Sequence, residues 1–294
     1  PHRRLFLTEW KALVAAASGT GDQQLELSQR TFGKSNFKKV YDKTPVPTGP
    51  LELGAASQNL LHEYCDAQTL DWHSQGQPFM KALQAEAMQN SGELVDADKI
   101  PVAAQRMWTS ALTLAGREFC SIMNYAGRHD TPRLVEPLAV LARAMNKNCV
   151  TERGPAAAAA MRKHPDDNRC YRGGGFLDDH RDFFTPGQKF RQPAFLATSF
   201  SRAVAEQFIR MRGGDDCVLW TIQIDPQRKC KHVNLVTKSH VEGEQEYLFA
   251  PYSVFTVLSV SWSVGSIDHP HAIELLAAVD NKEEPEDLPL APWS

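Results

Sequence analysis

Residues 240–251 carry glutamates at alternate positions directly before an apolar, aromatic run. Side chains at positions i and i+2 of a strand share one face, so we expect Glu244 and Glu246 to point in the same direction, roughly 6 to 7 Å apart along the backbone. Such a pair marks either a solvated strand entrance or a site where one carboxylate stabilises positive charge and the other handles a proton. Taken alone, the segment favours the solvated entrance, because charge runs usually lie on solvated faces.

A second candidate is Arg172, which is followed directly by Gly173, Gly174 and Gly175. A guanidinium group is planar, always charged and able to bind phosphate through two parallel hydrogen bonds, and glycine backbone lets a ligand approach closely. The spacing fits neither a Walker loop nor a dinucleotide-binding fingerprint. A surface arginine before a flexible turn is an equally weighted alternative.

Residues 195–208 have the pattern of a strand that ends in small hydroxyl residues, followed by a helix. Ser201 suits the N-cap of this helix, and the glycine pair at 213–214 ends it. Because serine and threonine often cap helices after strands, the segment by itself favours a structural role. The apolar face of the helix is expected to carry Val204, Phe208 and Met211.

Together the three segments resemble the Arg-Ser-Glu class of mono-ADP-ribosyltransferases, which includes clostridial binary toxins and vertebrate ecto-enzymes. That family has an aromatic-Arg-Gly segment, a Ser-Thr-Ser strand and a Glu-x-Glu strand that leads into an apolar run with a proline. The resemblance covers residues 165–262 and extends more weakly over the helices from about residue 105. The matching positions are Tyr171-Arg172-Gly173, Ala197-Thr198-Ser199 and Glu244-Gln245-Glu246, followed by residues 247–251.

The resemblance implies an NAD-dependent enzyme that transfers ADP-ribose to a protein side chain and releases nicotinamide through an oxocarbenium-like transition state. Glu246 would hold the ribose 2′-hydroxyl and stabilise the positive charge, a preorganised electrostatic role. Glu244 would orient and help deprotonate the attacking group. In this family a glutamate at that position accompanies arginine acceptors, so arginine is the first candidate acceptor. The catalytic set is then Glu246, Glu244, Arg172 and Ser199.

The resemblance also implies which residues bind NAD, the co-substrate, and it implies no metal. Arg172 would clamp the phosphates or the adjoining ribose, and the backbone of Gly173 would meet the nicotinamide amide. Phe208 would pack against nicotinamide, although a phenylalanine on a helix face is as often a core residue. The full set expected to bind NAD is Arg172, Gly173, Thr198, Ser199, Phe208 and Arg212.

One residue departs from the family pattern. The first serine of the Ser-Thr-Ser strand, which steadies the catalytic glutamate in the family, is Ala197 here. Either Thr198 or Ser199 is then the candidate to supply that hydrogen bond. Two alternatives to a transferase remain. One is an NAD glycohydrolase, in which water replaces the acceptor because the stretch that selects the target, residues 238–243, lacks the aromatic residue that some family members have there. The other is a non-catalytic module that binds NAD or protein, which Ala197 suggests.

Composition places the chain among globular proteins and sets limits on its partners. It has 294 residues, 42% apolar and 23% charged, with a net charge of -3. That acidity argues against a nucleic-acid partner. No apolar run reaches the roughly 18 residues that span a bilayer, and no secretory signal is recognised, which favours a cytoplasmic protein without a membrane partner. None of the six cysteines forms a CxxC pair, so we expect reduced, mostly buried thiols.

The periodicity changes along the chain from helical to alternating. Residues 58–150 predict helices, among them 79–88 and 103–116, whereas the chain beyond 165 predicts strands. A further helix begins either at Pro132, with Thr131 as its N-cap, or nearer Glu136, because Pro137 is unfavourable inside a helix. We therefore predict an α+β fold with a mixed, mostly antiparallel β core that forms an NAD cleft. The predicted domains are a partly helical region, 1–104, and a catalytic domain, 105–294, with core motifs in 165–262 and an acidic, proline-rich tail at 281–294.

Overall fold

The computed structural model describes residues 30–88, 100–147, 149, 165–214, 216–236 and 246–292. Two compact units can be distinguished, and each is described by itself. One comprises Gly33–Cys149 with Val236–Gly243, and the other comprises Pro1–Phe32, Val150–Leu235 and Glu244–Ser294. The sequence-based division at residues 104 and 105 concerns where catalytic activity resides, and it stays a prediction.

The first unit is helical, as the periodicity predicts. Its longest helix, α4, buries a stripe that includes Leu53, Leu60 and Tyr64 and packs chiefly on α8. These positions recur at helical spacing, so one face of α4 is apolar and the other is solvated. The helices are α3 (Asn36–Tyr41), α4 (Pro50–Ala67), α5 (Gln77–Met88), α6 (Ile100–Trp108), α7 (Phe119–His129) and α8 (Pro132–Asn146).

One predicted helix boundary in this unit is wrong, and another is decided between two alternatives. The predicted helix 103–116 ends at Trp108 and is followed by a hairpin of β1 (Thr113–Leu114) and β2 (Arg117–Glu118). Ala115 and Gly116 turn the chain with positive φ values of 47° and 82°, a conformation that a helix cannot contain. Helix α8 begins at Pro132 with Thr131 as its N-cap, which confirms the first alternative and excludes a start near Glu136. Pro137 lies inside the helix and lacks the N–H that would donate to the Arg133 carbonyl, so α8 has one backbone hydrogen bond fewer there.

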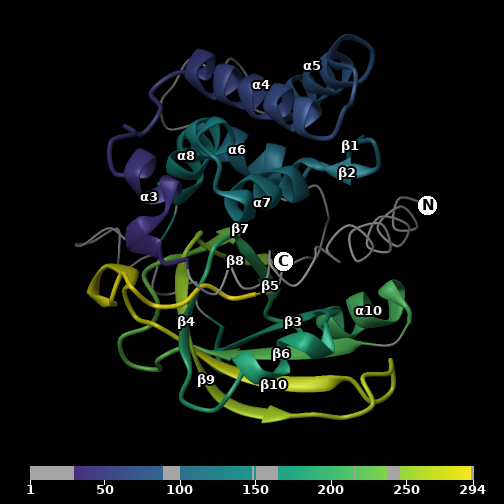
Figure 1. Cartoon of the computed structure of the whole chain (residues 1–294), viewed down its shortest axis with the longest axis vertical. Helices are drawn as coiled ribbons and strands as arrows, with labels where there is room; N and C mark the ends of the chain where they lie inside the picture. Colours follow the sequence, from purple (N-terminus) through teal and green to yellow (C-terminus); the bar gives the residue numbers. More distant parts are fainter. Residues whose placement is uncertain are drawn as a thin grey trace. The chain divides into compact units, whose positions relative to one another are not determined.

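The second unit is built on a single eight-stranded sheet, drawn in the lower half of Figure 1. Its order is β4-β9-β10-β6-β3-β5-β8-β7. Strand β10 runs parallel to β6, whereas the pairs β3–β5, β3–β6, β4–β9, β5–β8 and β9–β10 are antiparallel. The strands are β3 (Arg169–Gly175), β4 (Lys189–Gln192), β5 (Leu196–Ser199), β6 (Cys217–Gln223), β7 (Val233–Val236), β8 (Glu246–Phe249), β9 (Ser253–Ser261) and β10 (His271–Ala277). The predicted α+β class with a mixed, mostly antiparallel core is confirmed.

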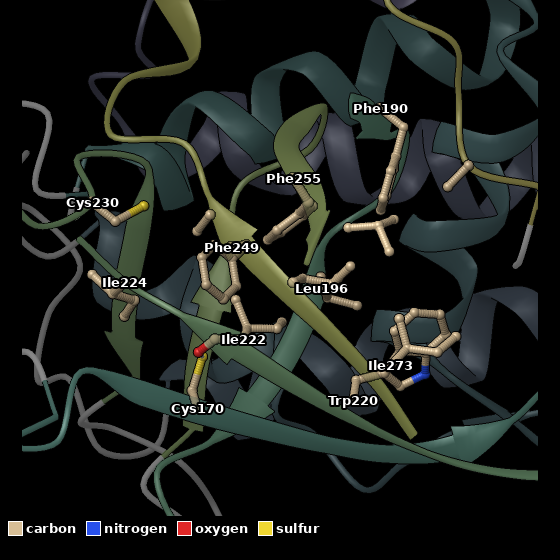
Figure 2. Packing of buried hydrophobic residues seen from close by; sticks show 14 of the residues in the cluster. Cys170, Phe190, Leu196, Trp220, Ile222, Ile224, Cys230, Phe249, Phe255 and Ile273 are labelled. Carbon is tan, nitrogen blue, oxygen red and sulfur yellow. The ribbon is translucent and has the colours of Figure 1, made fainter. Parts of the chain in front are cut away.

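Alternation along these strands sends every second side chain into one buried cluster. Figure 2 shows side chains from several strands converging there, among them Cys170 of β3, Trp220 of β6 and Phe249 of β8. Burying one large apolar side chain stabilises the fold by about 1.5–3 kcal/mol relative to leaving it exposed. Burial of Cys170 also raises the pKa of its thiol to about 12, so this thiol is inert at neutral pH. All six cysteines are free.

The acidic C-terminal segment is bound to the edge strand β4. Arg191 of β4 holds this segment and is only 1% exposed. Its backbone N–H donates to the Pro289 carbonyl at 2.9 Å. Leu290 is buried there too, and Trp293 lies outside the described residues. The Arg191 guanidinium donates to the carbonyl oxygens of Tyr252, Asn281, Glu284 and Pro285. No helix in the described parts of the chain combines the length and apolar character needed to cross a membrane.

Candidate active site

The three sequence motifs lie on neighbouring strands, because β5 sits between β3 and β8. Ser199 at the end of β5 is in register with Tyr171 on one side and with Glu246 on the other. Directly paired residues of antiparallel strands project to the same face, with Cβ atoms about 4.5–5.5 Å apart. Tyr171, Ser199 and Glu246 therefore form one row across one face of the sheet, which we call the Tyr-Ser-Glu row.

The two hydroxyl residues of the β5 motif point to opposite faces. Thr198 is 5% exposed and donates its hydroxyl to the backbone carbonyl of Tyr247, 2.6 Å away on β8. Ser199 is on the face of Glu246, and its hydroxyl oxygen accepts a hydrogen bond from the backbone N–H of Ser201 at 3.1 Å. A serine hydroxyl that accepts one bond still has its own hydrogen to donate. Of the two candidates to replace the family's first serine, only Ser199 faces the glutamate.

Arg172 follows Tyr171, so alternation turns it to the other face of β3, the face of its partner Trp220. Its guanidinium Nη1 donates to the backbone carbonyl of Ala197 at 2.8 Å. In the described strands, β3 and β5 are in register at only one residue pair, Tyr171 with Ser199. Arg172 thus supplies a side-chain hydrogen bond to β5 at the point where the backbone ladder stops, and it joins the arginine motif to the hydroxyl motif.

Tyr171 packs against the apolar cluster under helix α10 (Arg202–Arg212), and its hydroxyl donates to the Asp167 carboxylate at 3.3 Å. Desolvation, together with the negative charge of Asp167, raises the pKa of this phenol above its ordinary value. The phenol is thus a neutral hydrogen-bonding group at physiological pH. Sequence reasoning gave Tyr171 no role of its own, although strand alternation alone separates it from Arg172.

Helix α10 packs against β3 through Ala205 and Ile209, not through the predicted face of Val204, Phe208 and Met211. The reason is Gly173. A Cβ atom at that position would lie 1.9 Å from the Ala205 carbonyl oxygen, so the glycine lets the helix backbone rest on the strand. Phe208 is half-buried on the neighbouring face of the helix. The predicted contacts of Phe208 and of the Gly173 backbone with nicotinamide remain predictions.

Arg212 lies at the end of α10, across the last glycine of β3. A Cβ atom on Gly175 would meet the Arg212 guanidinium 2.2 Å away, and Nη1 of Arg212 donates to the Asp216 carbonyl at 3.2 Å. Desolvation lowers the pKa of this guanidinium from its ordinary value, although it stays charged. Arg212 therefore contacts the last glycine of the run that begins directly after Arg172.

The remaining predicted catalytic residue, Glu244, lies outside the described residues. Strand β8 begins at Glu246, which is half-buried at its first position. The described part of the chain also holds a group of possible metal ligands, His62, Glu63 and Asp66, on α4 of the other unit. His62 and Asp66 are exposed there and Glu63 is half-buried, and exposed acidic groups are common without an ion.

Comparison with known proteins finds no matching family model and no matching curated protein. Among solved structures, Vis toxin, an ADP-ribosyltransferase from Vibrio splendidus, shares 15% identity over 82% of this chain and 90% of its own, with a TM-score of 0.34. The ADP-ribosyltransferase HopU1 of Pseudomonas syringae pv. tomato shares 17% identity over 67% of this chain and 83% of its own, with a TM-score of 0.43.

The type III effector XopAI from Xanthomonas axonopodis pv. citri shares 14% identity over 89% of this chain and 93% of its own, with a TM-score of 0.45. Other matching structures include Plx2a, an ADP-ribosyltransferase toxin from Paenibacillus larvae. By their names, Vis, HopU1 and Plx2a are ADP-ribosyltransferases, the family that the three motifs of this sequence resemble.

Proposed function

We propose that this chain is a mono-ADP-ribosyltransferase that moves ADP-ribose from NAD to a protein side chain, arginine first, and releases nicotinamide. The observation that carries the proposal is the Tyr-Ser-Glu row. Tyr171, Ser199 and Glu246 come from motifs far apart in the sequence, yet they stand in register on three adjacent strands. A chance set of short motifs would have no reason to meet at one level of one sheet.

In the proposed reaction, the bond between the ribose C1′ and the nicotinamide nitrogen breaks, and the electron pair leaves with nicotinamide. Positive charge then develops on the ribose, and the carboxylate of Glu246 stabilises it while accepting a hydrogen bond from the 2′-hydroxyl. Ser199 donates its hydroxyl hydrogen toward Glu246 and so fixes the carboxylate before the substrate arrives. A preorganised charge of this kind is worth several kcal/mol of barrier.

The acceptor nitrogen forms the new bond to C1′ and gives up one proton. Glu244 is proposed to orient the acceptor guanidinium and to take that proton. Arg172 is also proposed to bind the dinucleotide phosphates, although its side chain starts on the face of β3 opposite the Tyr-Ser-Glu row and donates to the Ala197 carbonyl, so this contact requires its guanidinium to change rotamer. Arg212, which lies against Gly175 on the face of Tyr171, is proposed to add a second positive charge. Phe208 is proposed to pack against the nicotinamide ring.

One observation favours a second candidate, a module that binds NAD without consuming it. Ala197 has no hydroxyl where the family has its first serine. Against this candidate stands Ser199, which is in register with Glu246 and is proposed to be the missing donor. Hydrolysis of NAD by water is the third outcome, and it needs the same Glu246 without a competent acceptor site.

The test uses NAD labelled in the adenylate phosphate, with agmatine as a small guanidine acceptor and putrescine as the matched diamine without a guanidinium. A transferase for arginine labels agmatine and not putrescine, and it releases nicotinamide in equal amount. Release of nicotinamide without a labelled acceptor, in the presence of agmatine and of cell lysate, identifies a hydrolase. If NAD binds but stays intact, the transferase proposal is overturned. Glu244→Gln separates the steps, because it should abolish labelling while nicotinamide release persists.

A further inference from the structure

The helical unit contains a groove of about 510 Å³ among α4, α8 and residues 44–47, all within that one unit. We call it the α4–α8 groove. Helix α4 lines it with Glu52, Ala55, Ala56, Asn59 and Glu63, and α8 lines it with Arg133, Glu136, Pro137 and Val140. Within each helix these positions are three or four residues apart or adjacent, so each helix presents one continuous side to the groove.

Small side chains explain why two tightly packed helices leave this space. Ala55 and Ala56 reach only to Cβ along the middle of the α4 side, and Pro137 presents a flat ring from α8. The third side of the groove, formed by residues 44–47, contributes the rings of Pro45 and Pro47. The middle of the groove is therefore lined by small and apolar side chains.

The charged residues that line the groove are mostly acidic. Three glutamates, Glu52, Glu63 and Glu136, line the groove together with one cation, Arg133. The Arg133 side chain is 81% exposed and its Nη1 lies 3.9 Å from the Glu63 carboxylate, a geometry that contributes little energy in water. The groove thus carries an excess of two negative charges, since one arginine is set against three glutamates.

Glu52 is fixed at its end of the groove by neutral groups. Its carboxylate accepts hydrogen bonds from the backbone N–H of Thr48 at 2.9 Å and from the Thr48 hydroxyl at 3.3 Å. These bonds order the side chain without neutralising its charge. An occupant with positive charge at this end would meet a carboxylate that is already in place, which lowers the entropy lost on binding.

The length of the groove sets the size of the occupant. From Glu52 to Glu63 is 11 helical steps, so the α4 side extends for about 16 Å. An extended peptide advances about 3.3 Å per residue, and about five residues would fill the groove. We propose that the α4–α8 groove binds a short, extended, basic segment of a partner protein, with arginine or lysine side chains toward the glutamates and small apolar residues over the alanines.

Two other occupants fit less well. The acidic, proline-rich tail of this chain would be repelled by the glutamates, and its described part is already bound to Arg191 in the other unit. A nucleic acid would be repelled by the same charge. The proposal does not depend on the transferase activity, because none of the groove residues belongs to the Tyr-Ser-Glu row.

The experiment measures fluorescence anisotropy of a labelled peptide with two arginines separated by three alanines, added to the full chain without NAD. The matched probe carries two glutamates in place of the arginines. We expect the arginine peptide to bind, the glutamate peptide not to bind, and binding to weaken as salt rises from about 0.02 to 0.3 M, because surface charge pairs are screened. Equal binding of both probes, or no binding of the arginine probe, would overturn the proposal.

Two variants locate the site. The double variant Glu63→Gln/Glu136→Gln should weaken binding roughly fivefold or more, whereas Glu283→Gln/Asp287→Asn, which changes net charge equally on the exposed tail, should leave it unchanged. Ala55→Trp fills the groove and should abolish binding. The same substitution at Ala82, an exposed position of α5 outside the groove, is its control. If both tryptophan variants bind normally with native circular dichroism, the peptide does not occupy this groove.

Discussion

Ser199 and Glu246 lie directly opposite each other on the neighbouring strands β5 and β8. The preceding hydroxyl, on Thr198, is turned to the buried face and bonded to the Tyr247 carbonyl. We therefore expect Ser199→Ala to lower nicotinamide release by about tenfold or more, since it removes a donor to the charged group of the transition state. Initial rates at saturating NAD, beside a urea unfolding curve, provide the measurement.

The control is Thr198→Val, which deletes the other hydroxyl of the same motif. It leaves the Tyr247 carbonyl without its buried donor, so it should lower the free energy of unfolding by about 1–3 kcal/mol. The kcat of the folded fraction at saturating NAD should stay near that of the wild type, whereas loss of the predicted contact of Thr198 with NAD would change only KM. If Thr198→Val were the variant with impaired turnover and Ser199→Ala were active, the assignment of the two hydroxyls would be reversed.

Gly173 and Gly174 are adjacent and chemically identical, yet the structure gives them different roles. A methyl group at 173 would collide with the Ala205 carbonyl of α10, whereas one at 174 meets nothing within 4 Å. Gly173→Ala should lower the free energy of unfolding by about 1–3 kcal/mol, because the backbone of the helix must move. Gly174→Ala should be neutral. Equal urea midpoints for the two variants would contradict the packing of α10 on β3.

Local sequence signals predict part of the fold and of the site, and the pairing of distant strands decides the rest. The strands β5, β6 and β8 and the helix α10 follow from alternation, capping and glycine stops, all of which are local signals. The hairpin after α6 was missed because apolar spacing continues past Trp108 into a turn that depends on the φ values of Ala115 and Gly116. The choice between Thr198 and Ser199 depends on the register with β8, about 47 residues away, which no local pattern specifies.

Arg191 is the group that holds the C-terminal segment to β4. Replacing it with methionine keeps much of the volume but leaves the carbonyls of Asn281, Glu284 and Pro285 without their donor. We expect a loss of stability of about 3 kcal/mol or more and faster proteolysis near residue 285. Arg202→Met, at an exposed position on α10, is the control and should change neither. Unchanged proteolysis of Arg191→Met would show that the tail is held by other contacts.

His232 makes stability depend on pH. Burial lowers its pKa to about 4 from 6.5, and the ring lies 2.8 Å from the Ser253 hydroxyl and 2.7 Å from the Ala278 carbonyl. Between these two pH values the unfolded chain binds a proton that the folded chain does not. The neutral ring therefore contributes about 3 kcal/mol to the free energy of unfolding. This contribution is complete above pH 6.5 and is lost as the pH falls toward 4.

The measurement is the urea midpoint of the wild type and of His232→Gln between about pH 7 and pH 4.5. Burial also lowers the pKa values of His180 and His271, so the variant should keep part of the slope but show a smaller decrease than the wild type. His232→Asn serves as a second variant if glutamine does not fold. Identical slopes in wild type and folded variant would exclude His232 as a source of the pH dependence.

Glu246 is the residue on which the proposed chemistry depends, and Glu246→Gln keeps its size while it removes the charge. The most direct measurement is the release of nicotinamide from NAD by the purified wild type and by this variant, with equal urea midpoints as evidence that both are folded. The account predicts turnover by the wild type and a decrease of about a hundredfold or more in the variant, because the transition state loses its charge partner. Intact NAD with the wild type, or equal turnover by both proteins, would contradict the catalytic assignment.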